Sequence, residues 1–372
     1  MDIEIARAHD SRYFARQLSS CSSSAADRYI EFAAESTVVR VDGIAVVRFV
    51  KNGAHELKLE FLNDTTVNAR ERALRAVVAM LEALLPAARE CHRVVIEPSP
   101  APALTEQLLR EGLILRETHG ALIIPVDLIW QHAEFWLEGC GSSVYPYRHA
   151  LSNGRGHPLR PPKPTHRVYS RFIPWLEATF SWRALQVERD VELLHRWMNN
   201  PRVAHFWKED GEIAHQRRYL TELQADPHTT TLIGSLDDEP FVYVEAYWAK
   251  EDRIAPFYDA ADYDRGWHVL VGEEDYLGSS YFAAWFPSLA HYLFLDDCRT
   301  QRLVCEPRAD NARLIANLDR NGYAQLKHFN FPHKRALLAM LTRERFFGEM
   351  LLAPRWASAP EQASRRVSTL IS

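Results

Sequence analysis

The stretch HVLVGEEDYLGSSYFAAW, residues 268–285, decides how the second half of this chain folds. It begins as an apolar run typical of a buried strand, passes through a turn with two glycines, and continues with the apolar spacing of a helix. Backbone N–H groups at a helix N-terminus lack intrahelical partners and bind anions such as phosphate. The sequence therefore predicts a strand headed by His268, an anion-binding turn at Gly278, and a helix behind it.

The composition is that of a globular intracellular protein. The 372 residues suffice for two domains, and 47% are apolar and 25% charged. No apolar run is long enough to span a membrane, the N-terminus lacks a signal-peptide pattern, and the net charge of −5 disfavours nucleic acid. The five cysteines form no CxxC pair, which favours reduced thiols and no zinc site. We therefore predict a cytoplasmic protein that binds neither nucleic acid nor a membrane.

Both halves of the chain show α/β patterns. The first half reads as three strands, a long helix, and then strand, helix and strand; the second adds two helices near its start and ends in two strands. In each half a strand ends in Glu-Pro and leads into a helix closed by glycine, at residues 97–112 and 306–322. The first half is either a degenerate copy of the second or an unrelated α/β unit.

These patterns divide the chain into five parts. We place an N-terminal arm, an α/β domain, a linker, a second α/β domain and a flexible tail at residues 1–30, 31–145, 146–175, 176–352 and 353–372. The linker contains the basic run RHALSNGRGHPLRPPKPTHR, residues 148–167. Its proline, glycine and serine content favours an exposed connector over a binding surface.

Three long runs in the second half carry a resemblance: FVYVEAYWAKEDRIAPFYDAADYDRGWHVLVGEEDYLG, LAHYLFLDDCRTQRLVCEPRADNARLI and FNFPHKRALLAML. Residues 181–347 resemble the GNAT acyltransferases of siderophore biosynthesis, closest to the N6-hydroxylysine acetyltransferases of the aerobactin pathway and more distantly to the mycobactin lysine acyltransferases. The resemblance implies an α+β GNAT fold, with a mixed central sheet flanked by helices, over the catalytic domain at 176–352. It makes residues 31–145 a candidate degenerate GNAT-like repeat. It also implies acetyl-CoA or another acyl-CoA as co-substrate, no permanently bound cofactor and no metal.

The resemblance places coenzyme A at the turn that follows the His268 strand. The usual pattern is Gln/Arg-x-x-Gly-x-Gly/Ala, whereas here an acid, Asp275, stands first and a serine last. Gly278 still permits close backbone approach. The expected donor contacts are Leu270, Gly272, Leu277, Gly278, Ser279, Ser280, Tyr281 and Asn311. Of these, the N–H of Leu270 is expected to bind the thioester oxygen, and Asn311 either lies near the pantetheine arm or only begins the next helix.

His268 and Glu306 are the predicted catalytic residues. The reference pKa of histidine, ~6.5, suits a base at neutral pH. Distant relatives use a histidine and an acid 38 positions apart, and 268 + 38 is 306, where this chain has Glu306. Either residue is a candidate proton acceptor, and the alternatives are a histidine bonded within the sheet and an acid at a strand end. Tyr323 is either an acid for the thiolate or part of the core.

The acceptor is expected to contact aromatic and acidic side chains. Those predicted to pack an alkyl chain are Trp207, Tyr247 and Trp248, and candidates to pair with an ammonium group are Glu245, Glu251, Asp252 and Asp259. Each has a plain alternative, because aromatic residues fill cores and acids are commonly solvated. The remaining histidines considered, His205, His215, His291 and His333, lack metal-ligand spacing and are interpreted as structural.

The predicted function is transfer of an acyl group, with acetyl-CoA favoured, to the hydroxylamine nitrogen of an N-hydroxylated lysine, ornithine or diamine. The product is a hydroxamate for siderophore biosynthesis. Alternatives are succinyl-CoA or another donor, an unhydroxylated amine acceptor, and a non-catalytic CoA-binding partner of a siderophore synthetase. The first half is a candidate wall of the active site, homodimer contact or dock for such a synthetase.

Overall fold

The computed structural model describes residues 12–14, 28–32, 36–41, 44–51, 56–62, 69–84, 93–97, 102–138, 144–152 and 154–354. They fall into two compact units: unit 1 within 1–135, 171–179 and 347–372, and unit 2 within 136–170 and 180–346. Most of the expected arm at 1–30 and tail at 353–372 lies outside the described residues. No helix in the described part is both long and apolar enough to cross a membrane.

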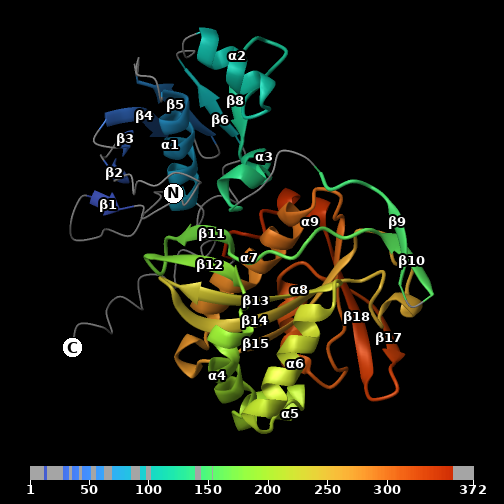
Figure 1. Ribbon diagram of the computed structural model, residues 1–372. Helices are drawn as coiled ribbons and strands as arrows, with labels where there is room; N and C mark the ends of the chain where they lie inside the picture. Colours follow the sequence, from blue (N-terminus) through green and yellow to red (C-terminus); the bar gives the residue numbers. More distant parts are fainter. Residues whose placement is uncertain are drawn as a thin grey trace, which may run out of the picture. The chain divides into compact units, whose positions relative to one another are not determined.

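Unit 2 is built on a mixed eight-stranded sheet (Figure 1). In spatial order the strands are β11 (Arg167–Ile173), β12 (Ala178–Ala184), β13 (Thr229–Leu236), β14 (Glu239–Trp248), β15 (Arg265–Val271), β16 (Arg302–Cys305), β18 (Arg335–Thr342) and β17 (Ala324–Asn330). Strands β15 and β16 pair in parallel. The pairings of β12 with β13, β13 with β14, β14 with β15, β16 with β18 and β18 with β17 are all antiparallel.

Helices cover both faces of this sheet, as the sequence predicts. They are α4 (Val187–Met198), α5 (Pro201–Trp207), α6 (Ile213–Ala225), α7 (Ser279–Asp296), α8 (Ala312–Arg320) and α9 (Arg343–Gly348). Because strand side chains alternate, His268 and Leu270 point to one face, where Leu270 packs with Leu194 of α4. Trp267 points to the other, where its ring centroid lies 5.5 Å from that of Phe286 in α7. The short helices α5 and α9 and the strand β11 were not predicted.

The sheet of unit 1 repeats this strand order. Its strands are β1 (Arg12–Phe14), β2 (Arg28–Phe32), β3 (Ser36–Val41), β4 (Ile44–Lys51), β5 (Glu56–Phe61), β6 (Arg93–Ile96), β8 (Leu122–Pro125) and β7 (Leu115–Arg116). As in unit 2, one parallel pair, β5 with β6, is joined by a helix, here α1 (Ala69–Leu84), and α2 (Pro102–Arg110) follows. A degenerate copy of unit 2 would have to keep this strand order and this single parallel pair, as unit 1 does. Only residues 33–35 join β2 to β3, so unit 1 has no room for counterparts of α4, α5 and α6.

Residues 146–175 differ from the expected exposed linker. They contain a hairpin, β9 (His149–Ser152) with β10 (Arg155–Pro158), and all of β11. Two arginines of the basic run, Arg155 and Arg160, turn inward, where oxygen atoms of Glu251 accept their hydrogen bonds, whereas Arg148 is exposed. Arg155 donates to the carbonyl of Glu251 at 2.9 Å, and Arg160, with a side chain 2% exposed, forms two bonds to the Glu251 carboxylate. Proline and glycine here mark the turns of a packed hairpin.

Gly272 is required by packing at the end of β15. An ideal Cβ at this position lies 2.0 Å from Cδ2 of Trp197, a buried side chain of α4. We expect Gly272→Ala to lower the free energy of unfolding by roughly 1–3 kcal/mol, because the rigid indole has to shift. Urea denaturation measures the change. Gly156→Ala is the matched control, since no atom lies within 4 Å of its Cβ; equal midpoints for the two variants would contradict the argument.

Candidate active site

His268 and Glu306 lie in direct contact. They come from the neighbouring strands β15 and β16, Glu306 being the residue that follows β16. The Nε2 atom of His268 is 2.9 Å from Oε1 of Glu306. The Glu306 side chain is 1% exposed and that of His268 is 27% exposed. The 38-residue spacing therefore places a buried carboxylate behind an imidazole that solvent reaches.

A second carboxylate occupies the other nitrogen of His268. Glu245 of β14 stands directly opposite His268, with Oε2 3.3 Å from Nδ1. Its Oε1 accepts hydrogen bonds from the hydroxyls of Tyr243, at 3.0 Å, and Tyr219. From the sequence, Glu245 was expected only to pair with an ammonium group, and its contact with His268 was not predicted. The signal was present, because Glu245 interrupts the apolar run FVYVEAYW.

The two carboxylates control the protonation of His268. Burial by itself lowers the pKa of the imidazole, but the charge of Glu306 and the hydrogen bonds to Glu245 and Glu306 outweigh it and raise the pKa to about 10. For Glu306, burial favours a higher pKa, but the charge and hydrogen bond of His268 overcome it and lower the pKa to about 2. The neighbouring carboxylates therefore favour the charged imidazole over the neutral histidine base expected from the sequence.

Three more side chains surround Glu306. The hydroxyl of Tyr247 donates to Oε2 at 2.7 Å. Nζ of Lys334 is 3.8 Å from Oε1 and donates to the backbone oxygen of Glu306 at 2.8 Å, and a guanidinium nitrogen of Arg253 lies 3.7 Å from Oε1. Tyr247 is only 2% exposed. Its predicted contact with an acceptor is therefore replaced by a contact with the Glu306 carboxylate.

The strands β15 and β16 separate beside this pair. They pair at only two positions, Arg265 with Leu303 and Gly266 with Val304, although β15 continues to Val271. A strand that loses its neighbour leaves a row of backbone groups open along that edge. We call this open edge of β15, from Trp267 to Val271 and next to His268, the slot.

Backbone alternation decides which amides face the slot. At the two ends of the β14–β15 ladder, Ala249 N–H donates to Asp264 at 2.9 Å and Gly272 N–H donates to Phe241 at 2.8 Å. Hydrogen-bonded positions alternate along an antiparallel pair, so the even-numbered residues of β15 direct their backbone groups toward β14. The slot therefore receives the odd-numbered amides, those of 269 and 271.

Two predicted donor contacts are corrected by this geometry. The N–H of Leu270 points to β14 and not to a thioester in the slot, and its side chain is 5% exposed in the core. The N–H of Gly272 donates a hydrogen bond to the backbone oxygen of Phe241, and Gly272 lies against the ring of Trp197. Sequence periodicity identified the strand correctly. Which alternate residues of β15 direct their N–H groups toward β14 depends on how the two strands pair, and this cannot be read from one segment.

The glycine-serine turn lies at the exposed start of α7. Gly278 is the N-cap with φ of 152°, a conformation that side chains rarely adopt. The first helical turn contains Ser279, Ser280 and Tyr281, and Leu277 before it is 43% exposed. The α7 bond nearest this end runs from Phe282 N–H to Gly278 at 2.9 Å. The helix therefore presents its positive end to solvent.

A cleft of 560 Å³ opens between the end of α5 and the start of α8. One side is lined by His205, Phe206 and Lys208, and the other by Arg308, Asp310, Asn311, Ala312 and Arg313. Asn311 lies in this wall and caps α8 by accepting a hydrogen bond from Leu314 N–H at 3.1 Å. The cleft carries an excess of positive charge, which suits an anionic ligand.

Of the cations that line the cleft, one forms an ion pair, and the other two have no ion-pair partner among the described residues. Arg308 forms an ion pair with Asp310 at 2.8 Å. For Lys208 and Arg313, the described residues provide no ion pair within 4.0 Å. These two cations are therefore available to an anionic ligand.

The other predicted acceptor contacts are not gathered at one place. Trp248 is 5% exposed and lies between two guanidinium groups, 4.1 Å from that of Arg160 and 4.0 Å from that of Arg265. This cation–π sandwich leaves no face for an acceptor. Trp207 is half-buried, with its ring 5.8 Å from Tyr243, and packs against the core.

Two further predictions have plain structural outcomes. Asp259 is exposed, and its backbone oxygen accepts a bond from Arg302 at 2.8 Å. The hydroxyl of Tyr323 accepts a hydrogen bond from Trp267 Nε1 at 3.0 Å, and Tyr323 is 2% exposed. Tyr323 therefore belongs to the core, one of its two predicted roles.

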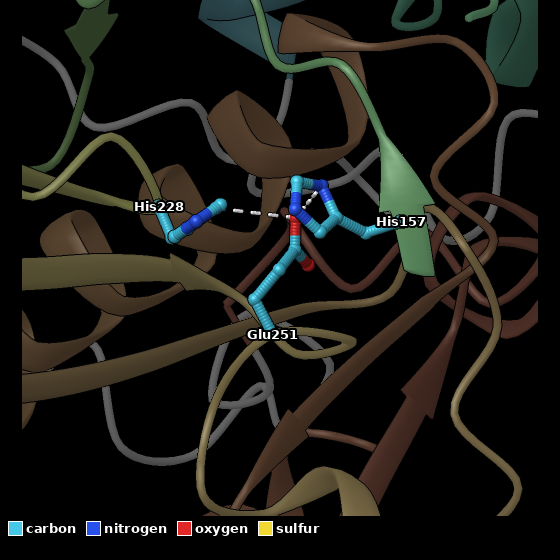
Figure 2. A group of neighbouring side chains, drawn as sticks. All are labelled: His157, His228 and Glu251. Carbon is cyan, nitrogen blue, oxygen red and sulfur yellow. Dashed lines mark ion pairs between the residues drawn. The ribbon is translucent and has the colours of Figure 1, made fainter. Parts of the chain in front are cut away.

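A separate polar cluster forms around Glu251. Figure 2 shows His157 and His228 converging on its carboxylate, with Nδ1 atoms 3.0 and 3.2 Å from Oε1. This spacing suits metal ligands. However, Arg160 already donates to both carboxylate oxygens, at 2.5 and 2.7 Å. A metal ion would lie beside this permanent charge and be repelled by it, so we interpret the cluster as a buried ion pair.

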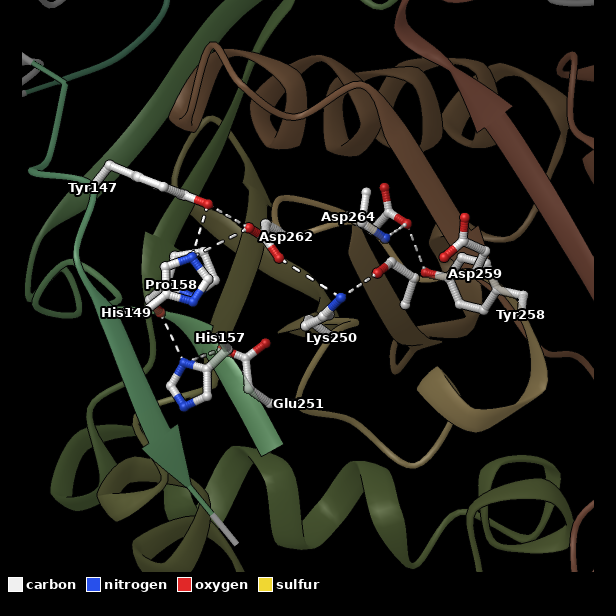
Figure 3. Close-up of polar contacts among 12 residues, drawn as sticks. Tyr147, His149, His157, Pro158, Lys250, Glu251, Tyr258, Asp259, Asp262 and Asp264 are labelled. Atoms are coloured by element: carbon white, nitrogen blue, oxygen red, sulfur yellow. Dashed lines mark hydrogen bonds and ion pairs between the residues drawn. The ribbon is translucent and has the colours of Figure 1, made fainter. Parts of the chain in front are cut away.

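This cluster belongs to a network that holds the loop between β14 and β15. In Figure 3, Tyr147 donates to Asp262 at 2.7 Å, and Lys250 donates to the backbone oxygen of Ala260 at 2.8 Å. The same loop carries Arg253, which faces Glu306. The hairpin therefore holds in place the loop that brings Arg253 near Glu306.

Comparisons with known proteins agree with this fold. Residues 186–331 match the family described as an acetyltransferase (GNAT) domain. A provisionally named lysine N-acyltransferase of Schizosaccharomyces pombe is 38% identical over 269 residues, which cover 68% of this chain and 79% of that protein. The N(6)-hydroxylysine O-acetyltransferase of Escherichia coli is 44% identical over 193 residues, 52% of this chain and 61% of its own length.

A fungal relative matches a smaller share of its own length. The N(5)-hydroxyornithine:cis-anhydromevalonyl coenzyme A-N(5)-transacylase of Beauveria bassiana is 44% identical over 195 residues, 51% of this chain and 43% of its own. The chain thus spans most of the first relative but only part of the other two. Because the S. pombe match exceeds two thirds of that protein, this chain belongs to the GNAT family of acyltransferases. The predicted fold class and enzyme class are confirmed.

Proposed function

We propose that this chain transfers an acyl group from an acyl-CoA, with acetyl-CoA favoured, to the hydroxylamine nitrogen of an N-hydroxylated lysine, ornithine or diamine. The product is a hydroxamate for siderophore biosynthesis in the cytoplasm. The contact of His268 with Glu306 beside the strand separation carries the proposal. The names of the E. coli and B. bassiana relatives support a hydroxylated amino acid as the acceptor.

The donor's phosphates match two positive features of unit 2. The start of α7 at Gly278 presents a helix N-terminus to solvent, and the cleft with Asn311 contains Lys208 and Arg313. Anions bind at both kinds of place. The pantetheine arm of coenzyme A then lies in the slot between β15 and β16, with the thioester oxygen near the amides of Val269 and Val271.

The transfer itself needs one bond formed, one broken and one proton moved. The nitrogen lone pair attacks the carbonyl carbon, the C–S bond breaks with its electron pair going to sulfur, and the nitrogen proton leaves. A hydroxylamine is less basic than an alkylamine, so its nitrogen is largely unprotonated at neutral pH. The carboxylate of the His268–Glu306 pair takes up the proton, because the imidazole already favours its charged form, and the proton finally reaches the thiolate. Amides aimed at the developing oxyanion supply much of the rate acceleration in such reactions.

One alternative acceptor has a specific observation in its favour. The S. pombe relative is named for lysine and not for hydroxylysine. The same site with an unhydroxylated amine, or with succinyl-CoA as donor, is therefore the second candidate function. A non-catalytic partner that only binds coenzyme A is disfavoured, because His268 and Glu306 form a buried contact beside the slot. A homodimer or a siderophore synthetase remains the candidate partner of the whole chain.

A matched panel of acceptors tests the proposal. Thiol release is followed with acetyl-CoA and succinyl-CoA against N6-hydroxylysine, N5-hydroxyornithine, N-hydroxycadaverine and lysine. We expect at least one hydroxylated acceptor to exceed lysine in kcat/KM by about tenfold or more, an effect worth about 1.4 kcal/mol. Mass spectrometry gives the product mass, and a coloured ferric complex separates a hydroxamate from an O-acyl product. Equal or greater activity with lysine, or a product that binds no ferric ion, would overturn the proposal.

A further inference from the structure

Glu245 is a buried acid that has no role in the acyl transfer proposed above. It is 6% exposed and lies on the face of β14 that carries His268. A buried carboxylate is costly unless it is hydrogen-bonded and paired with a positive charge. Tyr219 and Tyr243 supply two hydroxyl donors to one oxygen, and His268 Nδ1 faces the other at 3.3 Å.

The geometry around His268 limits its protonation state. A neutral imidazole has one N–H, whereas an imidazolium has two. Nδ1 faces Glu245 and Nε2 faces Glu306, at 3.3 and 2.9 Å. A neutral ring would set a nitrogen lone pair against one of two ionised carboxylates. Only the charged ring donates to both.

We propose that Glu245 is a positioning residue of the reaction centre, which keeps His268 in its charged form so that Glu245, His268 and Glu306 work as one unit. The inference rests on the proposed function. With two carboxylates and one imidazolium, this unit carries a net charge of −1. It collects the proton released by the acceptor nitrogen and becomes neutral, then returns that proton to the departing thiolate. The proton acceptor is thus a carboxylate of the unit and not a neutral imidazole.

The direction of the pKa shifts agrees with this arrangement. Glu306 and Glu245 together raise the pKa of His268 above its ordinary value despite burial. Burial, followed by the charge of Glu245, raises the pKa of both Tyr219 and Tyr243, so the two hydroxyls stay neutral donors. The titratable and charged groups that face the unit from the surrounding elements are Tyr219, Tyr243, Tyr247, Asp252, Arg253 and Lys334.

Glu245→Gln tests the proposal through the pH dependence of kcat/KM. Above its pKa, His268 loses the second proton and the wild-type rate declines. Glutamine has the same shape but no charge, so the pKa of His268 falls, and we expect the alkaline decline to move down by about 1–3 pH units. The KM for acyl-CoA stays unchanged. Glu222→Gln, an exposed acid on α6, is the control and keeps the wild-type profile.

A measurement on the wild type keeps the test independent of how the variant folds. Long-range proton–nitrogen NMR spectra of histidine rings distinguish the charged ring from both neutral forms, and the His268 signal is assigned by its absence in His268→Ala. We expect both nitrogens of His268 to carry protons at pH 8 in the wild type, and the loss of one proton to occur about 1–3 pH units lower in Glu245→Gln than in the wild type. A neutral His268 ring in the wild type, an unshifted Glu245→Gln profile, or a faster variant at pH 7 would overturn the proposal. Because the spectra need no acceptor, this failure is distinct from failure of the proposed function.

Discussion

Replacing His268 with alanine is expected to lower kcat by about 10²–10⁴-fold, the range associated with loss of a proton-transfer group. Among the residues that the structure describes, the ring is the only group that contacts both buried carboxylates, at 2.9 Å for Glu306 and 3.3 Å for Glu245. Without it, two negative charges face each other and proton transfer from the acceptor loses its path. The KM for acyl-CoA is expected to change by less than about twofold, because the start of α7 and the cleft do not include His268.

The control for this variant is a second histidine–glutamate pair in the same unit. His215 Nε2 lies 2.9 Å from Glu209 at the protein surface, and both side chains are about one third exposed, 35% and 29%. His215→Ala is expected to keep wild-type kcat, since surface ion pairs contribute little. Steady-state kinetics with saturating donor measure both variants. A His268→Ala enzyme within threefold of the wild type would contradict the assignment of His268 to the reaction.

Local patterns predicted much of the fold because they arise from local physics. The strand before Gly278, the turn and the start of α7 follow from hydrophobic periodicity and from the conformational freedom of one glycine. The contact of His268 with Glu306 came from a family spacing of 38 residues. Neither sequence separation nor periodicity alone places residues of β15 and β16 side by side.

What the sequence did not predict depends on neighbours that are distant along the chain. Trp248 was assigned to the acceptor, but Arg160 and Arg265 enclose it. Arg160 itself lies in a run whose proline and glycine content indicated a linker, and its partner Glu251 is 91 residues away. In each case a buried charge found its partner through tertiary packing, which composition does not encode.

Replacing Glu306 with glutamine is expected to affect both activity and stability. The glutamine side chain has the same shape, but the charges of His268 and Lys334 lose their buried counter-ion. Removing one partner of a buried ion pair typically costs about 3–5 kcal/mol in unfolding free energy. We expect a loss of this size at pH 7.5 by urea denaturation, together with a decrease in kcat of about 10²-fold or more.

The pH dependence of that stability loss distinguishes the charge from the shape. The folded pKa of Glu306, about 2, lies below the ordinary value of 4.5, so its ionisation stabilises the fold above pH 4.5 and this contribution is lost as the pH falls toward 2. The difference between wild type and Glu306→Gln is therefore expected to be constant near neutral pH and to shrink in acid. A difference that stays constant down to pH 3 would show that the carboxylate charge is not its source.

A variant at a second buried carboxylate distinguishes a loss of stability from a loss of catalysis. Asp190 is 2% exposed and forms two 2.7 Å bonds to Arg183 on another part of unit 2. Asp190→Asn removes a buried counter-ion of the same kind, so a similar loss of stability is expected with kcat close to wild type. If Asp190→Asn lowered kcat as much as Glu306→Gln does, the activity loss would reflect a loosened fold. Glu306→Asp completes the set: it keeps the charge on a shorter arm, so a stable but slow enzyme shows that catalysis needs the direct contact with His268 as well as the charge.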